Sequence, residues 1–130
     1  MSGKYSFGKT VKSSYSDTIQ KATDALAKEG FGVLTTIDVA ATLKKKLGKD
    51  TKPYVILGAC NPQFAHQALE AEPEIGTLLP CNVVVREQED GATRVDIMDP
   101  KAVLKLTERP EIAGIAGEVR QKLERVLASL

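Results

Sequence analysis

The spacing of hydrophobic and polar residues changes several times along the chain, and each change predicts a new strand or helix. Residues 4–12 (KYSFGKTVK) alternate loosely, and residues 31–37 (FGVLTTI) are rich in β-branched side chains, so both segments are predicted as strands. Residues 54–60 (YVILGAC) are nearly all apolar, which favours a buried strand in the interior of a sheet. Residues 81–88 and 93–98 flank the turn EDGA, in which Asp-Gly suits a tight hairpin.

Helical spacing occupies most of the remaining chain. Helices are expected over 13–30, 39–47 and 61–72, each with a Ser, Asp or Asn that can cap its first turn. Pro100 opens a short helical turn, and Pro110 opens a last, longer helix. The apolar stripe of that last helix is formed by Ile112, Ile115, Val119, Leu123, Val126 and Leu130.

The order of these elements is β-α-β-α-β-α-β-β-α, with residues 73–80 (PEIGTLLP) as a turn-rich connector. The order contains too few β-α-β units for a doubly wound parallel sheet, and its last two strands form an antiparallel hairpin. We therefore predict an α+β fold, a two-layer sandwich in which helices pack on one face of a mostly antiparallel or mixed sheet. With 130 residues, the chain is predicted to form a single domain over 1–130.

Composition and charge exclude several classes of protein. The 18 Lys and Arg residues nearly balance the 17 Asp and Glu residues, and the aromatic residues do not alternate with basic ones, so no nucleic-acid partner is expected. No apolar stretch reaches the length of a transmembrane helix, so no membrane partner is expected. The start, MSGKYSFGKT, lacks the apolar region of a signal peptide, which predicts a cytoplasmic protein with reduced thiols.

Two cysteines and the sole histidine are the candidates for chemistry. Cys60 stands directly before Asn61-Pro62, where a helix is predicted to begin, and the unpaired amides of a helix start favour a thiolate. His66 lies in the same predicted helix, and Cys81 begins the next strand. We expect a ligand-binding site formed by Cys60, Asn61, His66 and Cys81.

Three interpretations of these residues remain open. Two sulfurs and one imidazole, from Cys60, Cys81 and His66, would suit a soft transition metal such as zinc, although neither Cys-x-x-Cys nor His-x-x-x-His spacing is present. Alternatively, Cys60 is the nucleophile of a thiol-dependent enzyme or redox protein, with His66 as its base. In the third interpretation both cysteines are small apolar groups of the core, because free cysteines are often buried.

Long stretches of the chain resemble the family known as domain of unknown function 302. The resemblance rests on EGFGVLTTIDV, on YVILGACNPQFAHQALEAEPEIGTLLPCNVVV and on the hairpin that follows, and it covers roughly residues 5–100. The family's pattern matches Gly58, Cys60, Asn61, Pro62, Ala65, Gly76, Leu79, Pro80, Cys81 and Val83. The resemblance implies a compact α+β fold and a homodimer, and it implies no activity.

The function best supported by the sequence is the binding of a small ligand or a soft metal ion near residues 58–66 and 77–83. A thiol-dependent enzyme and a structural or interaction module are the alternatives. Whether the protein is an enzyme stays open. For the homodimer, the last helix or an exposed sheet edge is expected to provide the interface.

Overall fold

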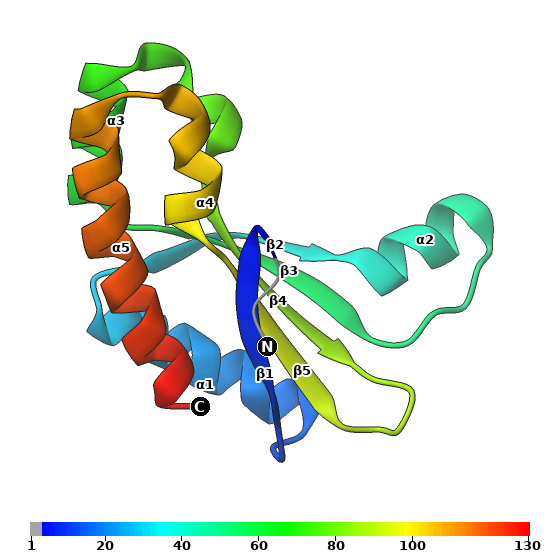
Figure 1. The fold of residues 1–130 in the computed structure, drawn as a ribbon. Coiled ribbons are helices and arrows are strands. Elements are labelled where there is room, and N and C mark those ends of the chain that lie inside the picture. Colours follow the sequence, from blue (N-terminus) through cyan, green and yellow to red (C-terminus); the bar gives the residue numbers. More distant parts are fainter. Residues whose placement is uncertain (1–3) are drawn as a thin grey trace.

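The computed structural model describes residues 4–130 as one antiparallel sheet with helices packed on it (Figure 1). The strands are β1 (Ser6–Val11), β2 (Gly32–Asp38), β3 (Tyr54–Cys60), β4 (Cys81–Glu87) and β5 (Thr93–Met98), in the order β1-β5-β4-β3-β2. The helices are α1 (Tyr15–Lys28), α2 (Val39–Leu47), α3 (Pro62–Ala71), α4 (Pro100–Leu104) and α5 (Pro110–Ala128), with short 3-10 helices η1 (Pro73–Leu78) and η2 (Lys105–Thr107). The predicted α+β class is confirmed. Residues 1–3, which the predicted domain 1–130 includes, lie outside the described residues.

The predicted caps explain why the helices begin where they do. The side chains of Ser14, Asp38 and Asn61 each accept a hydrogen bond from a backbone N–H in the first turn of α1, α2 and α3. Gly48 ends α2 in the left-handed region, with φ of 67°. The connector 73–80 differs from the prediction, because it contains η1. The side chain of Ile75 is buried there, and a helical turn lets the backbone form hydrogen bonds while Ile75 packs inside.

One face of the sheet carries the hydrophobic core. Alternate residues of β3, β4 and β5 point to this face and are buried under the helices: Val55, Leu57, Ala59, Cys81, Val83, Val85, Val95 and Ile97. The helices contribute apolar stripes, among them Ala22 and Leu26 of α1 and Val119, Leu123 and Val126 of α5. The stripe of α5, which we considered as a dimer interface, is therefore used inside the chain.

The other face of the sheet has no helical layer within residues 4–130. In Figure 1, α1, α3, α4 and α5 lie to the left of the sheet, while α2 stands apart on the right, at the end of the long β2–β3 hairpin. Ile56 and Val84 point to this open face and stay partly exposed. None of the residues of α2 is buried. We refer to α2 and the loop after it, residues 39–52, as the arm.

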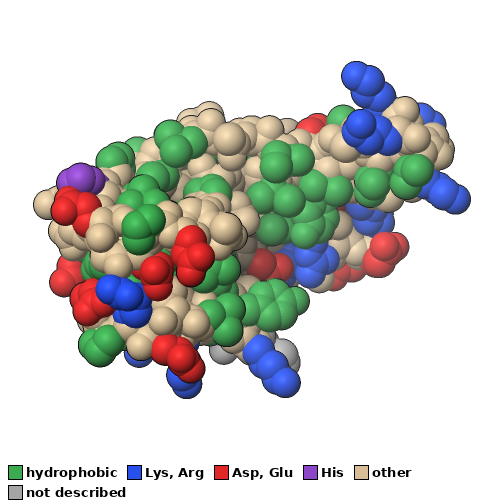
Figure 2. All heavy atoms as spheres, turned by 90° about the horizontal axis from the view of Figure 1, so that it is seen from above, with side chains coloured by type: hydrophobic (Ala, Val, Ile, Leu, Met, Phe, Trp, Pro, Cys, Tyr) green, Lys and Arg blue, Asp and Glu red, His purple; other side chains and the backbone are tan. Residues whose placement is uncertain are grey.

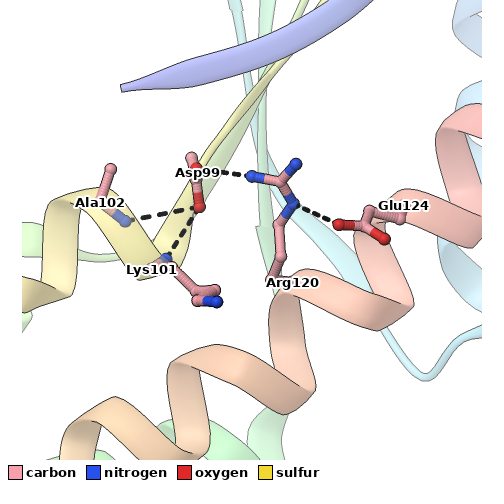
Figure 3. A network of polar contacts seen from close by, with 5 residues as sticks. All are labelled: Asp99, Lys101, Ala102, Arg120 and Glu124. Carbon is pink, nitrogen blue, oxygen red and sulfur yellow. Dashed lines mark hydrogen bonds and ion pairs between the residues drawn. The ribbon is translucent and has the colours of Figure 1, made fainter. Parts of the chain in front are cut away.

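A polar network joins α4 to α5 (Figure 3). One carboxylate oxygen of Asp99 accepts hydrogen bonds from the backbone N–H groups of Lys101 and Ala102, and the other accepts one from Arg120. The Arg120 guanidinium also donates to Glu124 and lies 3.9 Å from the ring centroid of Phe7. This network fixes the start of α4 against α5 and therefore helps to position the walls of the site described next.

Candidate functional site

A cavity of about 380 Å³ lies where β3 and β4 meet α3, η1 and α5. Its wall combines the end of β3, the start of β4 and the inward faces of the three helical segments. The lining side chains are predominantly apolar and include Phe31, Leu34, Phe64, Ala65, Ala68, Leu69, Leu79, Pro80, Leu104, Ile115 and Val119. This volume falls within the range of small-molecule sites, which are usually apolar with a few polar groups.

Both cysteines lie in the wall of this cavity. The register of the sheet explains their proximity, because Cys81 pairs with Ala59, the residue before Cys60. Both are free thiols, and Cys60 is partly exposed while Cys81 is buried. Burial, with a smaller contribution from neighbouring Cys60, raises the pKa of the Cys81 thiol to about 11. Cys81 is therefore a neutral thiol near neutral pH, and Cys60 is the more accessible of the two.

Asn61 also lines the cavity, but its polar atoms are engaged in holding two helices. Its side-chain oxygen accepts a hydrogen bond from the backbone N–H of Phe64 at 3.5 Å, which caps α3. Its Nδ2 atom donates to the carbonyl of Glu29 at 3.5 Å, just beyond α1. Asn61 thus ties the start of α3 to the end of α1, and it positions Cys60 and Phe64 on either side of it.

His66 lies apart from the two cysteines. Phe64, Ala65, Ala68 and Leu69 define the face of α3 that lines the cavity, and the helical period turns His66 away from that face. The His66 side chain is 75% exposed, and its Nε2 atom lies 2.6 Å from a carboxylate oxygen of Glu70, one turn further along α3. The structure therefore brings Cys60, Asn61 and Cys81 together and leaves His66 outside.

The proposed three-ligand metal set is not assembled in the described part of the chain. Among residues 4–130, no group of three or more His, Cys, Asp or Glu side chains is placed to hold a metal ion. Because His66 lies outside the cavity, it is also not placed to act as a base for Cys60. Of the predicted catalytic pair, only Cys60 reaches the cavity.

Most of the cavity wall was missed by the sequence reasoning, because the lining residues are ordinary apolar ones. Ile115 and Val119 belong to the predicted stripe of the last helix, but the stripe alone does not show that it borders a cavity. The peptide bond between Leu79 and Pro80, two further residues of the wall, is cis. Gly58 is required nearby, because a Cβ atom there would lie 2.3 Å from Thr35 Oγ1 and 3.0 Å from Pro80 Cγ.

These features define a class: a small α+β sandwich whose apolar cavity, at the ends of two central strands, contains a pair of free thiols. The chain belongs to the family described as domain of unknown function DUF302, which matches residues 7–130. A similar solved structure is an uncharacterized conserved protein DUF302 from Bacillus stearothermophilus. It is 31% identical, with a TM-score of 0.89, and the match covers 96% of this chain and 97% of that one.

The match to the family extends to residue 130, beyond the resemblance seen over residues 5–100. No curated protein matches the sequence. Within residues 4–130, none of the helices has the length and apolar character needed to cross a membrane.

Proposed function

We propose that this protein binds a small, largely apolar molecule in the cavity between β3, β4, α3 and α5. The observation that carries this proposal is the cavity itself, with a volume of about 380 Å³ and a wall of apolar side chains around two thiols. Binding is favourable in such a cavity, because an apolar ligand removes the apolar wall from contact with water.

The lining also selects against charged ligands. None of the described residues that line the cavity carries a charge, and Cys81 keeps its proton near neutral pH. A charged group would lose its hydration there without gaining an ionic partner. The ligand is therefore neutral, at least in the part that enters the cavity, and Thr35 and the thiols are the groups that give it orientation.

A thiol-dependent reaction is the second candidate function, and the position of Cys60 favours it. Cys60 is a partly exposed thiol in the wall of the cavity, so a bound electrophile would lie beside it. His66 does not act as the base in this reaction. A soft metal ion in this site would bind the sulfurs of Cys60 and Cys81 without an imidazole. Both thiols are free, which agrees with the reducing cytoplasm that we propose as the compartment.

Binding is tested with the neutral fluorescent probe N-phenyl-1-naphthylamine. We expect saturable binding to the wild-type protein and at least a tenfold loss of affinity in Ala65→Phe, whose new ring enters the cavity. His66→Phe is the matched control, because it adds an aromatic ring to the same helix on the side away from the cavity, and it should bind as the wild type does.

A second readout separates binding from thiol chemistry. Bound probe should slow the alkylation of Cys60 by iodoacetamide, as measured by mass spectrometry, because the thiol lies in the same wall. Absence of saturable binding, or equal binding by Ala65→Phe, would refute the proposed function. An alkylation rate that exceeds that of a free cysteine and falls in the presence of probe would favour the thiol-dependent alternative.

A further inference from the structure

The cavity has a buried inner end and an open mouth. Leu104 and Val119, which line the inner end under the helical layer, are almost fully buried. The exposed residues of the wall come from β2, α3 and η1, and they are Leu34, Thr35, Leu69 and Gly76. A Cβ atom on Gly58 would lie 2.3 Å from Thr35 Oγ1 and 3.0 Å from Pro80 Cγ, so β2 and the end of the η1 connector are neighbours here. We call the opening between β2 and the segment α3–η1 the mouth.

A β-bulge in β2 places Leu34 at the mouth. Val33 and Thr35 pair with neighbouring residues of β3, Ala59 and Gly58. Leu34 is therefore an extra residue without a partner on β3, and bulges of this kind re-aim side chains beside binding sites. Leu34 lines the cavity although it is 69% exposed. The entrance thus presents a large aliphatic side chain that an apolar ligand would remove from water.

The polar groups that a ligand can reach lie toward the mouth. Thr35 is exposed, and Cys60 is partly exposed. The side chain of Asn61 is engaged in hydrogen bonds to the backbone of Glu29 and Phe64. The inner end is formed by apolar side chains from the core. A ligand with one polar end is therefore expected to enter with its apolar end first and to keep its polar end at the mouth.

The segments that flank the mouth contain carboxylates and no Lys or Arg. Within residues 32–38 and 54–80, the acidic residues are Asp38, Glu70, Glu72 and Glu74. Arg109 approaches from the start of α5, but it is paired with Glu111 at 2.9 Å and with Glu72 at 3.9 Å. Figure 2 shows acidic side chains at the end of the molecule that carries the histidine, whereas basic side chains cluster at the tip of the arm. A negatively charged ligand end would lose hydration at the mouth without gaining a basic partner.

We infer, on the basis of the proposed function, that the cavity binds an elongated amphiphile with an uncharged polar end, and that Leu34 and Thr35 form the entrance that selects it. The wall crosses from β2 over β3 to β4, which at ordinary strand spacing spans about 10 Å. An extended aliphatic chain suits a slot of this length. Its alcohol or amide group then lies at the mouth, where water and the Thr35 hydroxyl are hydrogen-bond partners.

Ligands with the same chain and different polar ends test this class. Decanol and decanoate each compete with N-phenyl-1-naphthylamine near neutral pH, where decanoate is ionised. Decanol should displace the probe, and decanoate should bind at least tenfold more weakly. A probe that binds but is not displaced by decanol, or equal affinities for the two ligands, would overturn the inference and leave the proposed function standing. Absence of saturable probe binding would overturn both.

A lysine introduced at the mouth tests the orientation of the ligand. Thr35→Lys should raise the affinity for decanoate relative to decanol at least fivefold, because the new ammonium group can pair with the carboxylate at the mouth. Thr36→Lys is the matched control, because Thr36 is the next residue of β2, is exposed and does not line the cavity. It should leave the ratio of the two affinities unchanged. Equal ratios in Thr35→Lys and Thr36→Lys would show that the polar end does not lie at the mouth, contrary to the inference.

The role of Leu34 is tested by removing its apolar contact. Leu34→Ser should weaken decanol binding at least threefold, because the outer part of the chain loses the side chain that covers it. Leu106→Ser is the matched control, because Leu106 is 74% exposed on η2 and lies outside the cavity wall. Equal decanol affinities for Leu34→Ser and Leu106→Ser would refute the role of Leu34 as part of the entrance.

Discussion

The two faces of the same sheet differ in how much of their apolar surface the chain covers. On the covered face, Leu57, Val83 and Ile97 form one cross-strand row and are almost fully buried under the helices. On the open face, the adjacent row begins with Ile37, Ile56 and Val84, and its side chains remain partly or largely exposed. Residues that are neighbours in sequence thus have the same apolar character and different burial. The comparison separates the surface that stabilises this chain from the surface that is available to another molecule.

The largest expected effect comes from truncating one residue of each row. Leu57→Ala should lower the free energy of unfolding by about 2–5 kcal/mol, because it leaves a cavity in a packed core. Ile56→Ala should cost about 1 kcal/mol, because the Ile56 side chain is only partly buried. Urea denaturation measures both.

Both substitutions are introduced singly into the otherwise unchanged chain. Equal losses for Leu57→Ala and Ile56→Ala would mean that the open face is covered as fully as the helical face, contrary to the structure.

The second largest expected effect is a loss of stability at alkaline pH caused by Cys81, which lies on the covered face. Cys60 is its natural comparison, because Cys60 follows Ala59, the residue that pairs with Cys81. The pKa of Cys81 is raised from 9.0 to about 11, mainly by burial. Below pH 9 the thiol is protonated in both the folded and unfolded states, so this group adds no pH dependence. As the pH rises from 9 to 11, the unfolded state loses the proton while the folded state keeps it, and folding stability falls.

The fall in stability can be isolated with matched variants. Two pKa units correspond to about 2.7 kcal/mol at most, and Cys81→Ala should remove this part of the alkaline loss. Urea denaturation measures this loss at several pH values between about 8 and 11, which include the ordinary and the raised pKa of the Cys81 thiol. The proteins compared are the wild type, Cys81→Ala and Cys60→Ala. An equal alkaline loss in the wild type and Cys81→Ala would show that Cys81 titrates normally and is not buried as described.

The sequence predicts most of the fold because local signals agree with the final packing. The Asp-Gly turn, the caps at Ser14 and Asn61 and the stripe of α5 all depend on neighbours in sequence, and all are found where predicted. The order of the strands and the open face depend on contacts between distant segments. The apolar pattern of β3 indicates an interior strand, but it does not show whether helices of the same chain cover both of its faces.

The site was predicted only in part for the same physical reason. Cys60, Asn61 and Cys81 converge because β3 and β4 are neighbours, which the sequence made plausible. His66 lies outside the site, because it is the residue after Ala65 on α3 and successive residues of a helix point in different directions. Ala65 faces the cavity, and His66 faces away from it. The apolar wall has no distinctive residue types, so a periodic pattern predicts it as core and not as the lining of a cavity.

The smallest expected effect lies in the helical layer of the covered face, where an exposed ion pair joins α1 to α5. Arg125 donates two hydrogen bonds to a carboxylate oxygen of Glu29, at 2.9 and 3.1 Å. This hydrogen bonding, together with the charges of Arg125 and Lys122, lowers the pKa of Glu29 below its ordinary value, although burial opposes the shift. The stability that the pair contributes is present above the ordinary pKa of 4.5 and is lost as the pH falls through the lowered pKa.

Arg125→Gln should return the pKa of Glu29 toward its ordinary value, as measured by NMR titration of the Glu29 side chain. Lys122→Gln is the control and should produce a smaller change, because Lys122 acts on Glu29 only through its charge. The unfolding free energy at neutral pH should change little in either variant, because exposed ion pairs contribute little to stability. A large loss of stability in Arg125→Gln would mean that the helical layer depends on this contact, and that the buried side chains between the helices and the sheet do not hold the covered face by themselves.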